Sequence, residues 1–378
     1  MIIQSFLRWA ETAKTSDRAR AANALGRAWL ESEMNGEERE AALMAMTWLL
    51  DDPSPKVRLA LAEAIAGAED VPRSLILPLA HDQPQIACQI IARSPLLSEV
   101  DLVDLAARGD SVTRVLIASR FIVSAPVCAA IAEIGDAPEV EAMLDNPGAI
   151  VARGSLRRIT ERLAADPQIR EMLLDREELP TDARHILAVG VSQSLCASDL
   201  VRQVVGARRL ERIQREACDS ATVVLAGIAP AEDLPHLVDH LRRDGRLTPA
   251  FLMQALCTGR LDFFTASIVE LSGMDDRRVR SIVTDGRFHA VRALYESAGL
   301  DRDISEIFVE ATMLWRKAEG QGHGLFGGLA SKLISGFRQA GKADGKAAEL
   351  IDMVERLSII EHRQSARAYA SFLALAAA

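Results

Sequence analysis

Two histidines on one short stretch are the residues whose spacing first suggests chemistry. His236 and His240 stand four positions apart in a segment predicted to be helical over residues 231–243. Both imidazoles would then lie on one helix face and could grip one metal ion. The string resembles the HxxEH signature of metalloproteases, but Asp239 replaces the glutamate and no nearby carboxylate motif completes it. The simpler interpretation is a surface or partly buried histidine pair, so the sequence predicts no metal ion and no cofactor.

Arginines gather in the second half of the chain. A guanidinium group binds carboxylates or phosphates through two parallel hydrogen bonds. One set shares a helix surface and the other opens a later helix: Arg208, Arg209, Arg212 and Arg215, then Arg277, Arg278 and Arg280. Acidic residues are interleaved with both sets, so local ion pairs on solvated helix faces are the competing interpretation. Otherwise these arginines form a binding site for a partner protein or an anion.

No nucleophile or phosphate-binding loop accompanies these groups. The sequence has no GxSxG elbow, no GxxxxGK loop and no GxGxxG that follows a strand. Helical-repeat folds can host base-excision chemistry, which requires a basic channel and aromatic side chains that stack on bases. Aromatic residues make up only 4% of the chain. The sequence therefore favours a protein that is not an enzyme, and a helical-repeat hydrolase or glycosylase is the third alternative.

A further candidate surface lies near the C-terminus, in residues 324–338. Phe326, Leu329, Leu333 and Phe337 fall on one stripe of a helix that glycines loosen. Such an amphipathic stripe could dock into a groove of a partner protein or lie in a membrane interface. It could equally fold back over the end of the helical stack and bury the same side chains.

The elements that must position these residues repeat along the first half of the chain. Four times an acidic or capping residue, usually with a proline, precedes a short helix rich in Ala, Leu, Ile and Val. The spacing is roughly 30 residues, which is typical of stacked helical repeats. A pair of short antiparallel helices cannot bury its apolar stripes alone, so it must stack on its neighbours. The sequence predicts an all-α fold, a HEAT- or armadillo-like α-solenoid of short antiparallel helix pairs.

The pattern divides the chain into four parts. HEAT-like repeats are expected over residues 1–185, and a second helical half over 186–318, with one long helix from about 200 to 226. Residues 319–346 contain two glycine-rich stretches that flank the amphipathic segment, and residues 347–378 form a terminal helix. We expect this helical tail to be mobile.

Bulk composition limits the compartment and the partners. The chain has 378 residues, a formal net charge of -9 and five cysteines. This charge argues against a protein that coats nucleic acid over its whole surface. The cysteines are widely separated within apolar helical patterns, which is typical of core residues in a reducing compartment. Because no transmembrane segment and no signal peptide are predicted, we expect a cytoplasmic protein.

Several short stretches also resemble a known family. They are Leu247 to Leu252, Ala255 to Cys257, Asp262 to Phe264, Arg277 to Arg280, Ala293 to Tyr295 and, upstream, Asp51 to Glu63. Together these are similar to an uncharacterised bacterial family, domain of unknown function 2336, which is common in alphaproteobacteria, over most of residues 40–300. The resemblance implies a HEAT-like helical fold and supplies no activity.

Two hypotheses of function follow. The first is a scaffold or adaptor that binds a protein partner through a surface of the stacked helices, with Trp48, Trp315 or the arginines from Arg208 to Arg215 as anchors. The second is a nucleic-acid or nucleotide binder that uses the arginines of the second half, with an affinity that falls steeply with salt. Contact of residues 324–338 with a peripheral membrane surface is a lesser alternative.

Overall fold

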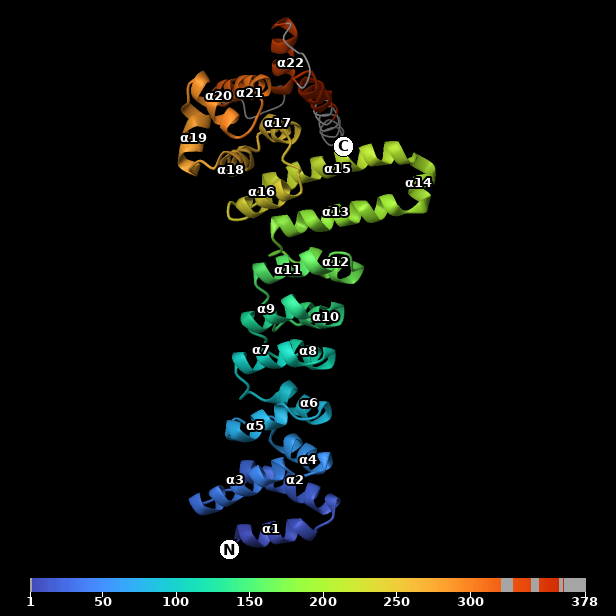
Figure 1. Ribbon diagram of the computed structural model, residues 1–378, viewed down its shortest axis with the longest axis vertical. Helices are drawn as coiled ribbons and strands as arrows, with labels where there is room; N and C mark the ends of the chain where they lie inside the picture. Colours follow the sequence, from blue (N-terminus) through green and yellow to red (C-terminus); the bar gives the residue numbers. More distant parts are fainter. Residues whose placement is uncertain (1, 321–328, 341–346, 360–362, 364–378) are drawn as a thin grey trace, which may run out of the picture. The chain divides into compact units, whose positions relative to one another are not determined.

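The computed structural model describes residues 2–320, 329–340, 347–359 and 363. Helices joined by short turns make up this part of the chain, which contains no β-strand beyond an isolated bridge between Val123 and Ala149 (Figure 1). The prediction of an all-α fold is therefore confirmed. The helices form two compact units, residues 1–179 and residues 180–378, called unit 1 and unit 2 below.

Unit 1 consists of short helices whose first residues match the capping and proline signals of the sequence. They are α1 (Ile2–Thr12), α2 (Thr15–Glu31), α3 (Gly36–Leu50), α4 (Pro55–Ile65), α5 (Arg73–Ala80), α6 (Pro84–Arg93), α7 (Glu99–Arg108), α8 (Ser111–Ala118), α9 (Ala125–Ile134), α10 (Ala137–Asp145), α11 (Arg153–Leu163) and α12 (Pro167–Leu174). The predicted capping box of Ser98 and Asp101 is formed at the start of α7. Proline occupies the first turn of α4, α6, α9, α10 and α12, where a helix needs no amide donor.

Alternate helices of unit 1 pack on one another in two rows (Figure 1). In the even-numbered row each helix contacts the next, from α2 through α12, and in the other row α1 contacts α3, α3 contacts α5, α7 contacts α9 and α9 contacts α11. Leu61, Ile90 and Ile131 are completely buried between these helices. No helix pair could bury such side chains alone, so the packing between neighbours stabilises each pair.

Arginine–carboxylate pairs link successive helices of the even-numbered row. Arg18 is the fourth residue of α2, and its Nε lies 2.7 Å from Oδ2 of Asp52, just before α4. Arg58 is the fourth residue of α4, and its Nε lies 2.6 Å from Oδ2 of Asp82, just before α6. Oδ1 of Asp52 also accepts a hydrogen bond from the amide of Ser54 at 2.8 Å. Asp52 and Asp82 therefore each accept an amide hydrogen bond at the start of one helix of this row while they bind the preceding helix of the same row.

The contacts of Asp52 with Arg18 and with the amide of Ser54 shift the pKa of its carboxyl group. Burial of the carboxyl acts to raise its pKa, but the hydrogen bonds from Arg18 and from the amide of Ser54 outweigh burial, and the pKa lies below its ordinary value. The same balance of burial against Arg58 lowers the pKa of Asp82. Both carboxylates are therefore held in their charged form.

A second group of arginines caps helix C-termini. Nη2 of Arg120, which follows α8, donates to the carbonyl of Ser94 at 2.7 Å, and Nη1 donates to the carbonyl of Ile91, at the end of α6. Arg162 of α11 donates in the same way to the carbonyls of Ala132 and Gly135, at the end of α9. The last carbonyls of a helix lack partners within it, so these bonds satisfy them and also tie neighbouring helices together.

Unit 2 contains longer and less regular helices. They are α13 (Thr181–Ala197), α14 (Asp199–Val205), α15 (Ala207–Ile228), α16 (Leu234–Arg243), α17 (Pro249–Cys257), α18 (Leu261–Ser272), α19 (Asp276–Asp285), α20 (Phe288–Ser297), α21 (Arg302–Gly320), α22 (Leu329–Ala340) and a helix over residues 347–359. Phe264, Tyr295 and Phe308 pack ring against ring in its main core, and the hydroxyl groups of Tyr295 and Thr312 lie 2.7 Å apart. Leu333 of α22 and Val354 are also buried in this core.

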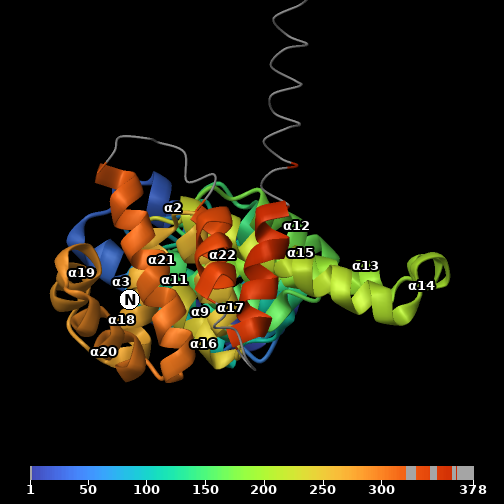
Figure 2. The same ribbon diagram turned by 90° about the horizontal axis from the view of Figure 1, so that it is seen from above.

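Helices α13, α14 and α15 form a hairpin that extends past the other helices of unit 2, with α14 at its tip (Figure 2). The single helix predicted from about residue 200 to 226 is interrupted here, which corrects the sequence prediction. Gly206 separates α14 from α15 and has a φ of 79°. This left-handed conformation is easy for glycine and does not continue a right-handed helix. The first residues of α13 precede residue 185, where the sequence placed a domain boundary.

Candidate functional site

The tip of the hairpin exposes apolar side chains. Leu195, Leu200 and Val204, called the tip surface below, are 61%, 75% and 84% exposed. None of the residues of α14 is buried. The stretch from Ile186 to Ser198 contains no Asp, Glu, Lys or Arg. Exposed large apolar side chains that gather in one place are typical of an interaction surface.

The first set of predicted arginines lies on α15, next to this tip. Arg208, Arg209, Arg212 and Arg215 are all exposed. Arg215 donates through Nε to the carbonyl of Glu211 on its own helix at 3.4 Å. The sequence therefore identified a set of exposed cations on α15, and the structure adds exposed apolar side chains on α14, the helix that precedes it.

The second set opens α19 and is largely engaged by acidic neighbours. The carboxylate of Asp275 caps the amides of Arg277 and Arg278. Arg280 is paired with two carboxylates, because its Nη1 lies 2.9 Å from Asp262 and its Nε 3.0 Å from Asp276. All three arginines are exposed. The competing interpretation of solvated ion pairs applies well to Arg280.

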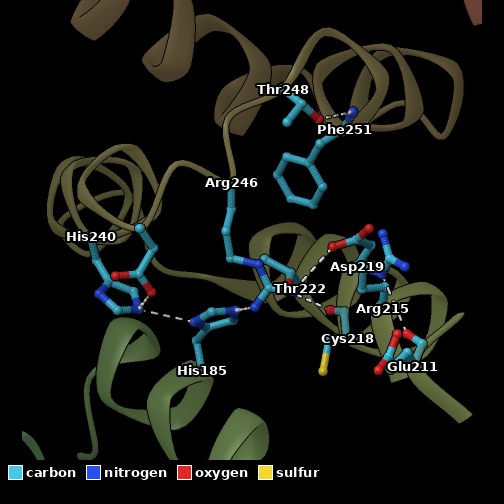
Figure 3. A network of polar contacts seen from close by, with 11 residues as sticks. His185, Glu211, Arg215, Cys218, Asp219, Thr222, His240, Arg246, Thr248 and Phe251 are labelled. Atoms are coloured by element: carbon cyan, nitrogen blue, oxygen red, sulfur yellow. Dashed lines mark hydrogen bonds and ion pairs between the residues drawn. The ribbon is translucent and has the colours of Figure 1, made fainter. Parts of the chain in front are cut away.

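The two candidate metal-binding histidines, His236 and His240, differ in their exposure to solvent and in their contacts. His236 is exposed, whereas His240 is half-buried and faces His185 of α13 (Figure 3). Nδ1 of His185 lies 3.0 Å from Nε2 of His240, and the rings meet edge to face. Among the described residues, no three or more His, Cys, Asp or Glu side chains are grouped so that they could hold a metal ion. The structure thus pairs His240 with His185 and not with His236.

A polar network continues from this histidine pair to α15 (Figure 3). Nη1 of Arg246 lies 3.4 Å from Nε2 of His185, and Nη2 donates to Oδ1 of Asp219 at 3.2 Å. A guanidinium group has no acceptor, so Nε2 of His185 must accept and its proton must be on Nδ1. That proton is then donated to Nε2 of His240. The chain of bonds fixes one neutral tautomer of His185.

The surroundings of His185 keep it neutral. Burial, then the electrostatic effects of His240 and Arg246, lower the pKa of His185 from 6.5 to about 4, while Asp182 acts in the opposite direction. Nearby, the amide and the hydroxyl group of Thr181 donate to Oδ2 of Asp233 at 3.0 and 2.9 Å. Both contacts attach the start of α13 to the region of α16. The network therefore braces the base of the hairpin.

A pocket of about 350 Å³ opens beside this network, between α15, α17 and the helix over residues 347–359. Phe251, Met353 and Leu357 give it an apolar lining, and Asp219 and Arg356 add charge. Among the described residues that line it there is no cysteine or histidine, and the hydroxyl groups are those of Ser220 and Thr248. Thr248 is engaged as the N-cap of α17, where it accepts from the amide of Phe251 (Figure 3).

The remaining predicted anchors differ in their exposure. Trp48 is 37% exposed, whereas Trp315 is only 3% exposed and cannot anchor a partner. Leu333 is 1% exposed, because α22 packs on α21, so this side chain lies in the core of unit 2 and not in a docking stripe. Phe326 and the side chains of Leu329 and Phe337 lie outside the described residues.

Sequence reasoning did not identify His185, Asp219 or Arg246 as members of one site. His185 and His240 are 55 positions apart, and Arg246 and Asp219 are 27 positions apart. The only signal was the position of His185, directly before the stretch from Ile186 to Ser198 that contains no Asp, Glu, Lys or Arg. Its partners are defined only once α13, α15 and α16 are packed together.

Comparison with known proteins gives one match. The pattern of a family described as an uncharacterised protein conserved in bacteria, DUF2336, matches residues 86–326. The resemblance carried by the stretches from Leu247 to Tyr295 lies inside this range, and the turn at Asp51 lies before it. No curated protein and no solved structure matches the chain. None of the described helices is long and apolar enough to cross a membrane.

Proposed function

Since the chain belongs to DUF2336, an uncharacterised family conserved in bacteria, we propose its function from its own surfaces: it is a non-enzymatic helical-repeat scaffold that binds a protein partner. Unit 1 is the HEAT-like α-solenoid of this proposal. The packing of alternate helices and the arginine–carboxylate pairs at its turns support that assignment. A stack of this kind displays side chains from a rigid support.

The tip surface is the observation that carries the proposal. Leu200 and Val204 expose most of their apolar area, and Arg208 and Arg209 follow directly after Gly206. Each fully exposed side chain of this size forgoes about 2 kcal/mol of burial energy. A partner with an apolar groove and acidic side chains at its rim would recover this energy and pair with the guanidinium groups.

The proposal is tested by capture of bound proteins from a bacterial lysate with the tagged chain. Leu200→Ser with Val204→Ser, and separately Arg208→Ala with Arg209→Ala, should each reduce recovery of the same partner at least tenfold. The matched control is Arg277→Ala with Arg278→Ala, because these residues occupy the same second and third positions of α19 that Arg208 and Arg209 occupy in α15. Circular dichroism checks that every variant keeps its helices. Equal recovery by the tip variants and the control would refute the proposed interface.

A nucleic-acid or nucleotide binder is the second candidate function. The exposed arginines of α15 favour it, but Arg280 is already paired with Asp262 and Asp276. Binding through phosphates requires an affinity that decreases steeply with salt. The anisotropy of a fluorescent oligonucleotide at low salt tests this, and an unchanged signal would end the hypothesis.

The state of the cysteines supports a proposal for the cellular compartment. All five cysteines are free in the structure, and Cys128, Cys218 and Cys257 are buried. Burial raises the pKa of Cys128 to about 11, so its thiol stays protonated and unreactive. Thiols that serve as small core residues suit a reducing compartment, and we place the protein in the cytoplasm.

A further inference from the structure

A second pocket of unit 2 lies apart from the polar network and the tip surface. It has a volume of about 370 Å³ and is lined by the last turn of α15 and the first turns of α16, α18 and α19. Leu234, Pro235 and Phe263 give it an apolar part, and Arg260 contributes a guanidinium group. Pockets of this size hold small organic molecules.

Arg260 and Arg280 both line this pocket, and of these two Arg260 lacks a counter-ion among the described residues. Its Nε is buried and has no hydrogen-bond partner within the described residues, and none of their carboxylates forms an ion pair with its guanidinium group. A buried donor without an acceptor destabilises the folded chain. The pocket's two carboxylates, Asp262 and Asp276, are both bound by Arg280 and are largely exposed to solvent.

The absence of a side chain at Gly227 leaves the space that this guanidinium group occupies. A Cβ at position 227 would lie 2.3 Å from both Cζ and Nε of Arg260, so any other residue would displace the side chain. The glycine belongs to the last turn of α15, whose negative dipole end favours a cation. The guanidinium group is therefore held in position at the wall of the pocket.

Other arginines that lie near the end of a helix donate their hydrogen bonds to carbonyl groups of that helix end. Arg120 follows α8 and donates to carbonyls at the end of α6, and Arg316 of α21 donates to the carbonyls of Ile282, Val283 and Gly286 at the end of α19. Arg260 has a comparable position: it follows α17 and lies against the end of α15, just as Arg120 follows α8 and lies against the end of α6. No such bond engages it in the described part of the chain, which leaves its donors for another molecule.

We propose that this pocket binds the carboxylate of a small, partly apolar molecule through Arg260. One guanidinium group matches the single charge of a carboxylate and can form two parallel hydrogen bonds with it. A doubly charged phosphate would keep one charge that Arg260 does not balance, and Asp262 and Asp276 would repel it more strongly than they repel a singly charged carboxylate. The apolar lining accepts the remainder of the ligand. This site is independent of the partner surface at the hairpin tip.

The test uses benzoate as the carboxylate probe, with saturation-transfer NMR on the full chain. Benzoate should give a signal, while benzamide, which has the same shape without the charge, should give none, and inorganic phosphate should not compete. Arg260→Gln should weaken benzoate binding about 10- to 100-fold, as expected for loss of a charged hydrogen-bonded pair. Arg278→Gln is the control, because Arg278 is exposed and does not line the pocket.

Two further variants keep the proposal open to refutation if Arg260→Gln fails to fold. Ala231 is exposed and lines the pocket, so Ala231→Trp should fill it and abolish the benzoate signal. Gly227→Ala should weaken binding by displacing the guanidinium group. The proposal is wrong if the wild-type chain gives no signal, if benzamide binds as well as benzoate, if phosphate displaces benzoate, or if both variants bind benzoate like wild type.

Discussion

The burial of His185 beside His240 and Arg246 makes the free energy of unfolding of unit 2 depend on pH. The pKa of His185 is about 4 in the folded protein and 6.5 when it is unperturbed. Between these values the unfolded chain binds a proton that the folded chain does not. The stabilisation from neutral His185 is therefore fully present above pH 6.5 and is lost as pH falls toward 4.

The magnitude follows from the two pKa values. Each unit of difference corresponds to about 1.4 kcal/mol, so the whole shift is worth about 3 kcal/mol. Between pH ~7.5 and pH ~5, most of the unfolded chains become protonated at this residue and the expected loss is about 2 kcal/mol. Arg246, Asp182 and Asp244 are the charged groups that face the pair, and the guanidinium group of Arg246 opposes protonation of His185.

The assay is hydrogen exchange read by mass spectrometry in peptides from α13 and α16, with intrinsic rates corrected for pH. His185→Gln cannot titrate and keeps only part of the hydrogen bonding. It should be less stable than wild type at pH ~7.5, but should lose about 2 kcal/mol less on acidification to pH ~5. Peptides from α4 in unit 1 are the control and should not differ between the two proteins. Equal losses in α13 for both proteins would refute the proposed role of His185.

Three further predictions concern the helix ends. Asp52→Asn should cost about 3 kcal/mol in urea unfolding, because the carboxylate that binds Arg18 is only 1% exposed. The control is Asp17→Asn, at the exposed Asp17–Arg20 pair, which should change the free energy of unfolding by less than about 0.5 kcal/mol. A similar loss in both variants would contradict the stabilising role of the Asp52–Arg18 pair. Gly206→Ala should destabilise the hairpin by about 1 kcal/mol because of its positive φ, and faster exchange in α14 would show this. Arg316→Met removes the guanidinium group that donates to three carbonyls at the end of α19, and it should lower the melting temperature by several degrees. An unchanged melting temperature would show that water replaces these hydrogen bonds.

The helices and their starts could be predicted because their signals are local. The proline turns before α4 and α6 and the capping box at Ser98 depend on residues within one helical turn of each other. The interruption at Gly206 was missed because a glycine inside a helical pattern is tolerated in most helices. Its positive φ is set by the direction in which α15 returns along α13.

The candidate sites were less predictable because they depend on packing between distant segments. His236 and His240 have a spacing that suggests a shared ligand, but α13 covers only His240. Arg260 has no distinguishing neighbours in the sequence, and its role arises from the close approach of Gly227, 33 positions earlier. A sequence pattern cannot report which side of a helix another helix will cover.

The arginine–carboxylate pairs of unit 1 have a consequence for how such a protein can change its length during evolution. Arg18 pairs with Asp52 just as Arg58 pairs with Asp82, so the same type of ion pair joins α2 to the turn before α4 and α4 to the turn before α6. Duplication or deletion of a whole helix pair would recreate the same junction on either side. Insertion of a single helix would not, because it would place an arginine opposite the wrong row. Between α2 and α6, a change of length by complete helix pairs is thus compatible with the chemistry of the turns.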